Sequence, residues 1–149
     1  MNAGGFTYET WFKWNGGGNV NAIIDYAGTE KLVRKTTDNF AGMEVNASAN
    51  YSLGGPAVSN QWHYAAAVFT AVSSNLGADS VTGNFTFYLD TNTPTATVSN
   101  VIITSFGDTL NRTIGVGMHP AGFASDYFNG LIYAPRVTLG GFERAQSPL

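Results

Sequence analysis

Cysteine is absent from the 149-residue sequence, and basic residues are scarce. Without cysteine the chain can form no disulfide, no thiolate metal site and no cysteine nucleophile. Lysine and arginine number seven and the formal net charge is −3, so the sequence offers no basic stripe for nucleic acid. No apolar run approaches the roughly 18 residues of a membrane-spanning helix, which argues against membrane insertion.

Charged residues of both signs make up only 11% of the chain, against 44% hydrophobic residues. Few charges and many large apolar side chains argue against a disordered chain and against a helical protein with many salt bridges. The sequence instead has 18 glycines together with frequent Asn, Thr and Ser, which favour turns and strands. The length suits a single domain, residues 1–149, with a hydrophobic core of its own.

Alternating side chains predict an all-β protein. From residue 6 to residue 14, bulky apolar residues occupy four of the five even positions, which is the pattern of a half-buried strand. Residues 53–56 are predicted to form a break and residues 73–83 a polar loop. Pro135 cannot donate to a ladder, so the last strand should lie at a sheet edge or carry a bulge. Further strands are predicted at 20–26, 30–34, 41–45, 62–72, 84–90, 95–103, 113–118 and 128–139.

Four segments are similar to those of the laminin-G-like family of jelly rolls, which has the concanavalin A-like fold. They are 6–13 (FTYETWFK), 62–69 (WHYAAAVF), 85–90 (FTFYLD) and 128–132 (FNGLI), the last followed by Arg136 and Val137. The resemblance implies an antiparallel β-sandwich of the concanavalin A-like jelly-roll type. It also implies core positions for Trp11, Trp62, Phe6, Phe69, Phe85, Phe87 and Phe128.

The sequence departs from that family in two respects. Tyr133 and Ala134 stand where the family has an acidic pair, and the chain looks trimmed at both ends. A missing edge strand would leave its neighbour with unpaired backbone groups. We therefore expect that a homodimer can form through open sheet edges.

Related jelly rolls include glycoside hydrolases and polysaccharide lyases, but the residues argue against both activities. A glycosidase needs two carboxylates flanking one bond, which on a strand would be acids two or four residues apart. The ten acids of this chain are isolated, and its two histidines, His63 and His119, are distant in sequence. No G-x-S-x-G motif is present either. We expect no enzyme activity, with a hydrolase or lyase built from carboxylates on different strands as a remote alternative.

Aromatic side chains are the main candidate ligand-binding residues, because sugars present C–H faces on which rings can stack. Trp14 ends a predicted strand beside three glycines, which suggests a position on a loop rim. The segment 118–127 combines an imidazole, a carboxylate and two rings in a predicted loop. Its alternative role is a long hairpin whose Phe123 closes one end of a sheet. The candidates are Trp14, Tyr51, His119, Phe123, Asp126 and Tyr127.

The resemblance also implies a structural calcium ion as the candidate cofactor. Hard cations take several carboxylate and carbonyl oxygens, and Asp25, Asp90 and Asp126 stand near predicted turns where they could supply them. The replacement of the acidic pair by Tyr133 and Ala134 speaks against such a site. An ordinary role in surface turns is the alternative for these aspartates.

These features predict a non-catalytic, lectin-like carbohydrate-binding module of an exported protein, located outside the cell or on its surface. Its partner would be a polysaccharide or another glycan. The alternative is a structural or adhesion domain of a cell-surface or viral appendage protein, because the same fold serves such roles without a decisive site.

Overall fold

The computed structural model describes residues 4–17, 20–26, 30–35, 40–45, 49–75, 80–104, 114–117 and 127–139. The regular elements within these residues are all strands, and no helix among them could cross a membrane. The strands are β1 (Phe6–Trp14), β2 (Val20–Tyr26), β3 (Glu30–Lys35), β4 (Phe40–Val45), β5 (Ala49–Pro56), β6 (Trp62–Asn75), β7 (Ser80–Leu89), β8 (Ala96–Thr104), β9 (Ile114–Val116) and β10 (Gly130–Leu139).

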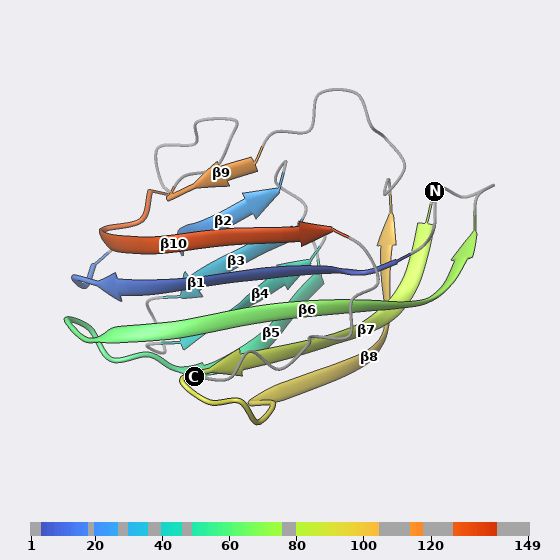
Figure 1. Cartoon of the computed structure of the whole chain (residues 1–149), viewed down its shortest axis with the longest axis horizontal. Coiled ribbons are helices and arrows are strands. Elements are labelled where there is room, and N and C mark those ends of the chain that lie inside the picture. Colours follow the sequence, from blue (N-terminus) through green and yellow to red (C-terminus); the bar gives the residue numbers. More distant parts are fainter. Residues whose placement is uncertain are drawn as a thin grey trace.

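The strands form two five-stranded antiparallel sheets that lie one over the other (Figure 1). The front sheet has the order β10-β1-β6-β7-β8, and the back sheet has the order β5-β4-β3-β2-β9. The predicted antiparallel β-sandwich is confirmed, and the strands predicted at 6–14 and 20–26 have these bounds in the structure. A homodimer through the edge strands remains a prediction.

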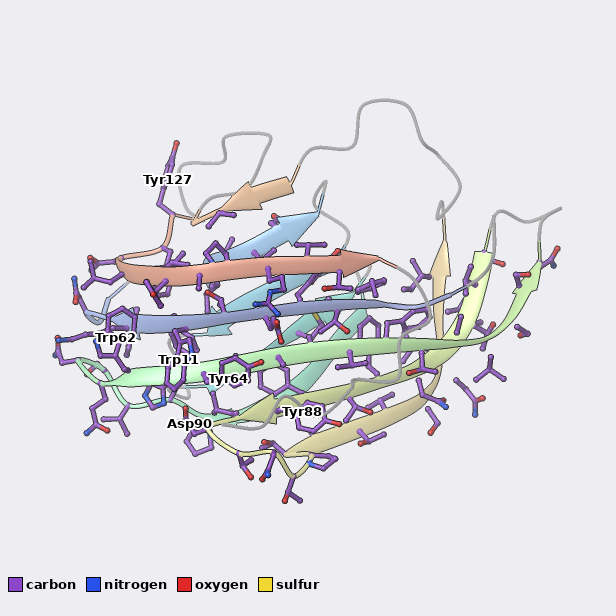
Figure 2. All side chains as sticks on the ribbon, viewed as in Figure 1. Trp11, Trp62, Tyr64, Tyr88, Asp90 and Tyr127 are labelled. Carbon is purple, nitrogen blue, oxygen red and sulfur yellow. The ribbon has the colours of Figure 1, made fainter. Side chains whose placement is uncertain are left out.

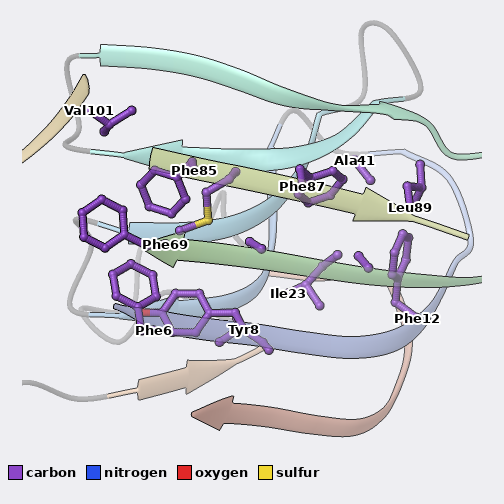
Figure 3. Close-up of a cluster of buried hydrophobic side chains, with 14 of the residues drawn as sticks. Phe6, Tyr8, Phe12, Ile23, Ala41, Phe69, Phe85, Phe87, Leu89 and Val101 are labelled. Atoms are coloured by element: carbon purple, nitrogen blue, oxygen red, sulfur yellow. The ribbon is translucent and has the colours of Figure 1, made fainter. Parts of the chain in front are cut away.

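The core lies between the sheets and is built largely from rings of the front sheet (Figure 3). Phe6 stacks on Phe69 with ring centroids 5.3 Å apart, and Phe69 lies 4.8 Å from Phe85. Burial of each such ring contributes about 1.5–3 kcal/mol. The core positions expected for these three residues and for Phe87 are confirmed, and Phe128 packs against the cluster.

The break expected at residues 53–56 is wrong, because these residues belong to β5. The glycines there serve close strand packing instead of a turn. A Cβ atom on Gly54 would lie 1.7 Å from the carbonyl oxygen of Ala41 in β4, so only glycine permits this approach. Pro56 is the last residue of an edge strand, where its missing N–H is tolerated.

The polar loop expected at residues 73–83 is also wrong over most of its length. Strand β6 continues to Asn75 and β7 begins at Ser80. Val81 is buried between its strand neighbours Ser74 and Ile103. Ser80 and Thr82 of β7 alternate with the buried Val81 and so lie on the outer face, where a strand of a two-layer sandwich meets solvent.

The expected irregularity around Pro135 is confirmed, since β10 is an edge strand and carries a bulge. Glu9 pairs with Arg136 and Trp11 pairs with Tyr133, so two residues of β10 stand opposite Thr10 alone. One of them, Ala134, has a φ of 50°. The Thr10 hydroxyl lies 3.1 Å from the Tyr133 carbonyl oxygen and donates to it across the bulge. Such bulges re-aim the side chains beside them.

Candidate functional site

Outward-facing side chains of β10, β1 and β6 form a regular grid on the outer face of the front sheet. Trp11 of β1 stands opposite Tyr133 of β10 on one side and Tyr64 of β6 on the other. Lys13 follows Trp11 by two residues and lies on the same face of β1. Trp62 of β6 stands opposite Lys13. Side chains at opposite and diagonal positions of a sheet are near enough to touch. Figure 2 shows the rings of Trp11, Trp62 and Tyr64 close together at one end of the sheet.

Trp11, Trp62 and Tyr133 together form what we term the aromatic platform. Their side chains are 44%, 47% and 67% exposed. The three residues line an open depression of about 260 Å³. Larger contiguous apolar patches on a protein surface often mark binding sites. The platform is therefore the strongest candidate binding site among the described residues.

A hydrogen-bonded network holds one flank of the platform. The Tyr64 ring lies 5.4 Å from the Trp11 ring at a tilt of 53°. Its hydroxyl donates to one carboxylate oxygen of Glu9 at 2.7 Å, and Arg136 donates to the other oxygen at 2.9 Å. Both oxygens of Glu9 are thereby engaged. The network restricts the ring orientations and places polar groups beside the apolar surface.

A second hydrogen-bonded network lies at the start of β6, next to Trp62. The buried ring of His63 lies with Nδ1 2.5 Å from an oxygen of Asp90 and with Nε2 2.9 Å from the carbonyl oxygen of Val58. The other Asp90 oxygen accepts from the backbone N–H of Tyr64 at 2.7 Å. Both ring nitrogens thus lie within hydrogen-bond distance of an acceptor oxygen, one from a carboxylate and one from a backbone carbonyl. His63 therefore fixes the start of β6 to two neighbouring turns.

The expectation that Trp14 lies exposed on a loop rim is contradicted. Only 5% of its surface is exposed, and it belongs to the core cluster. β1 continues to Trp14, which pairs with Gly130, and the backbone N–H of Asn60 donates to its carbonyl oxygen at 2.6 Å. Its side chain points the same way as that of Phe12 and into the sandwich. Trp14 therefore presents no ring to a ligand.

The core positions that the resemblance implied for Trp11 and Trp62 are wrong as well, since both residues are exposed. The sequence holds the signal that identifies them. Trp11 stands at an odd position of β1, out of phase with the buried Phe12, and Trp62 is likewise out of phase with the buried His63. Strict alternation places both indoles on the solvent face.

The remaining candidate residues do not join the platform. Tyr127 is exposed, but it lies beyond the β10 edge and points away from the platform (Figure 2). Tyr51 lies in β5 of the back sheet, and its side chain is outside the described residues. His119, Phe123 and Asp126 also lie outside the described residues.

The described residues form no group of three or more His, Asp or Glu side chains that could hold a metal ion. Asp25 is fully buried within β2 of the back sheet. Asp90 lies after β7 of the front sheet, where His63 and the Tyr64 amide engage its two oxygens. Asp90 does not fit a calcium ligand while those bonds stand. Calcium binding that involves Asp126 remains a prediction.

No protein-family model and no curated protein matches this sequence. Among solved structures, the chain is similar to a native heptameric SAP-like pentraxin from Limulus polyphemus, with a TM-score of 0.66 and 19% sequence identity. The match covers 89% of this chain, which spans 63% of the length of the pentraxin. At that identity the likeness shows the fold alone. The chain thus has the concanavalin A-like jelly-roll fold that was expected from its sequence.

Proposed function

We propose that this protein is a non-catalytic glycan-binding module and that the aromatic platform is its binding surface. The observation that carries the proposal is the contiguity of Trp11, Trp62 and Tyr133 on three adjacent strands, with all three rings exposed. Rings held on a rigid sheet present a broad apolar surface to the C–H face of a sugar. Glu9 and Arg136 lie beside them and offer the polar contacts that orient such a ligand.

The charged groups near the platform support binding without catalysis. The Glu9 carboxylate is engaged by Arg136 and by the Tyr64 hydroxyl, and the Asp90 carboxylate by His63. A glycosidase needs one free acid and one free carboxylate across the bond that it cleaves. Neither carboxylate is free to act in that way. We place this module in an exported protein that meets polysaccharide outside the cell.

Truncation of the platform tests this function. In pull-down and titration against a panel of soluble and insoluble glycans, Trp11→Ala and Trp62→Ala should each weaken binding about thirtyfold, the loss expected of a central aromatic contact worth about 2 kcal/mol. Their melting temperatures should stay near wild type because both rings face solvent. Tyr127→Ala is the matched control, since it removes an exposed ring that lies off the platform. Running the panel with and without calcium tests the predicted ion.

Two outcomes would contradict the proposal. One is glycan binding that survives the loss of both tryptophans. The other is that Trp11→Ala or Trp62→Ala changes the mass measured by sedimentation and leaves glycan binding unchanged. The platform would then be a contact between copies of the chain. That second result would favour the structural or adhesion domain.

A further inference from the structure

The charged side chains around the platform differ in whether they have a partner. Strands β10, β1 and β6 carry Glu9, Lys13 and Arg136 as their Asp, Glu, Lys and Arg residues. Glu9 is paired with Arg136, and no carboxylate of the described residues lies within salt-bridge distance of Lys13. The Asp90 carboxylate also lies beside the platform, but His63 and the Tyr64 amide engage its two oxygens. Lys13 is therefore the charged side chain here that lacks an oppositely charged partner among the described residues.

Lys13 occupies a central place in the grid. It faces outward with Trp11, stands opposite Trp62 on β6, and stands opposite the exposed Leu131 on β10. A sugar ring stacked on the two indoles would cover the ammonium group and remove water from it. Burying an unpaired charge is costly, so a neutral ligand would lose part of its stacking energy here. An anionic group at the same position would compensate for that cost.

Arg136 provides a second cationic group on the same face. Its side chain is largely exposed, and its guanidinium group binds Glu9 through Nη1. Lys13 and Arg136 lie about four residues apart along the strand direction, which corresponds to about 13 Å. Two cations at that separation suit a polymer with repeated acidic groups better than a ligand with a single terminal acid.

We propose that the ligand of the platform is an acidic polysaccharide, with one carboxylate or sulfate bound by Lys13 and its sugar ring stacked on Trp11 and Trp62. This inference rests on the proposed function, because it names the ligand class of the same site. Carboxylate and sulfate share the chemistry that Lys13 recognises, a compact anion that accepts hydrogen bonds from an ammonium.

The test compares polymers that differ only in charge. The full chain is titrated with polygalacturonate, with the same polymer after methyl esterification, and with dextran sulfate against plain dextran. Polygalacturonate should bind about fivefold more tightly than its ester, the gain expected from one exposed ion pair of about 1 kcal/mol. The preference should shrink as salt is added. Lys13→Gln should abolish it and Lys13→Arg should retain it, both with unchanged melting temperatures.

Each result is decisive for one of the two proposals. A methyl ester that binds as tightly as the acid, or a preference that survives Lys13→Gln, overturns the acidic ligand and leaves glycan binding standing. Absence of binding to every acidic and neutral polymer overturns glycan binding itself. Preferential binding of dextran sulfate that requires Lys13 and Trp62 supports the acidic class and assigns sulfate as the recognised group.

Discussion

Asp90 holds an unusual position for a single residue, since it follows β7 in the left-handed region with a φ of 55°. Aspartate and asparagine adopt this conformation more readily than alanine does. From there its carboxylate reaches both the His63 ring and the Tyr64 amide, which lie at the start of β6. One side chain thus links the turn after β7 to the strand that carries Trp62.

We expect Asp90→Ala to lower the free energy of unfolding by about 1–3 kcal/mol, because the buried His63 ring loses a partner and the backbone is strained. Asp90→Asn is the matched control. It keeps the shape and the left-handed conformation, and its amide can still form hydrogen bonds with the Tyr64 N–H and the His63 ring. Urea denaturation measures the difference. A wild-type free energy of unfolding for Asp90→Ala would show that the two hydrogen bonds contribute little to stability.

At the scale of elements, the approach of β10 to β1 depends on Gly130. A Cβ atom there would lie 2.1 Å from the carbonyl oxygen of Lys13 and 2.8 Å from a ring carbon of Phe128. The nearer atom belongs to the backbone, so a side chain cannot be fitted without moving a strand. This explains the glycine in the F-N-G segment that the resemblance pointed to.

Gly130→Ala should destabilise the protein by about 1–3 kcal/mol, the usual cost of overpacking, and should weaken glycan binding because β10 carries Tyr133. Leu131→Ala serves as the control, since this neighbouring side chain is exposed. Thermal melting and glycan titration are measured for both variants. A Gly130→Ala variant with wild-type stability would mean that β10 can shift along or away from β1 at no cost.

Sequence patterns predict strands well where one face is apolar and fail where composition resembles that of a loop. Alternation in β1 has period two, so its two faces can be told apart from the order of its residues. The serines and threonines at the start of β7 and the glycines of β5 give the opposite impression. Their strand character comes from pairing with distant segments, such as Val81 with Ile103, which local sequence does not contain.

At the scale of the molecule, the jelly roll could be predicted and the platform could not. Alternation alone places Trp11 on the solvent face, but the family resemblance pointed to the core and was wrong. The platform further requires the register of three strands, because Tyr133 meets Trp11 only through the bulge in β10. A bulge adds one residue to one strand and changes which side chains meet, and the sequence signals it only through Pro135.

The chain's three tryptophans offer a test of the whole arrangement, since Trp11 and Trp62 face solvent and Trp14 faces the core. In Trp14→Phe, iodide should quench nearly all of the indole emission, and a bound glycan should protect it. In the double variant Trp11→Phe/Trp62→Phe, the remaining emission comes from Trp14. It should be blue-shifted, resist quenching by iodide and stay unchanged when the glycan binds. Similar quenching in both proteins would contradict the assignment of inner and outer faces. Glycan protection of Trp14 alone would move the ligand away from the platform, because a buried indole could respond only through a change in the core.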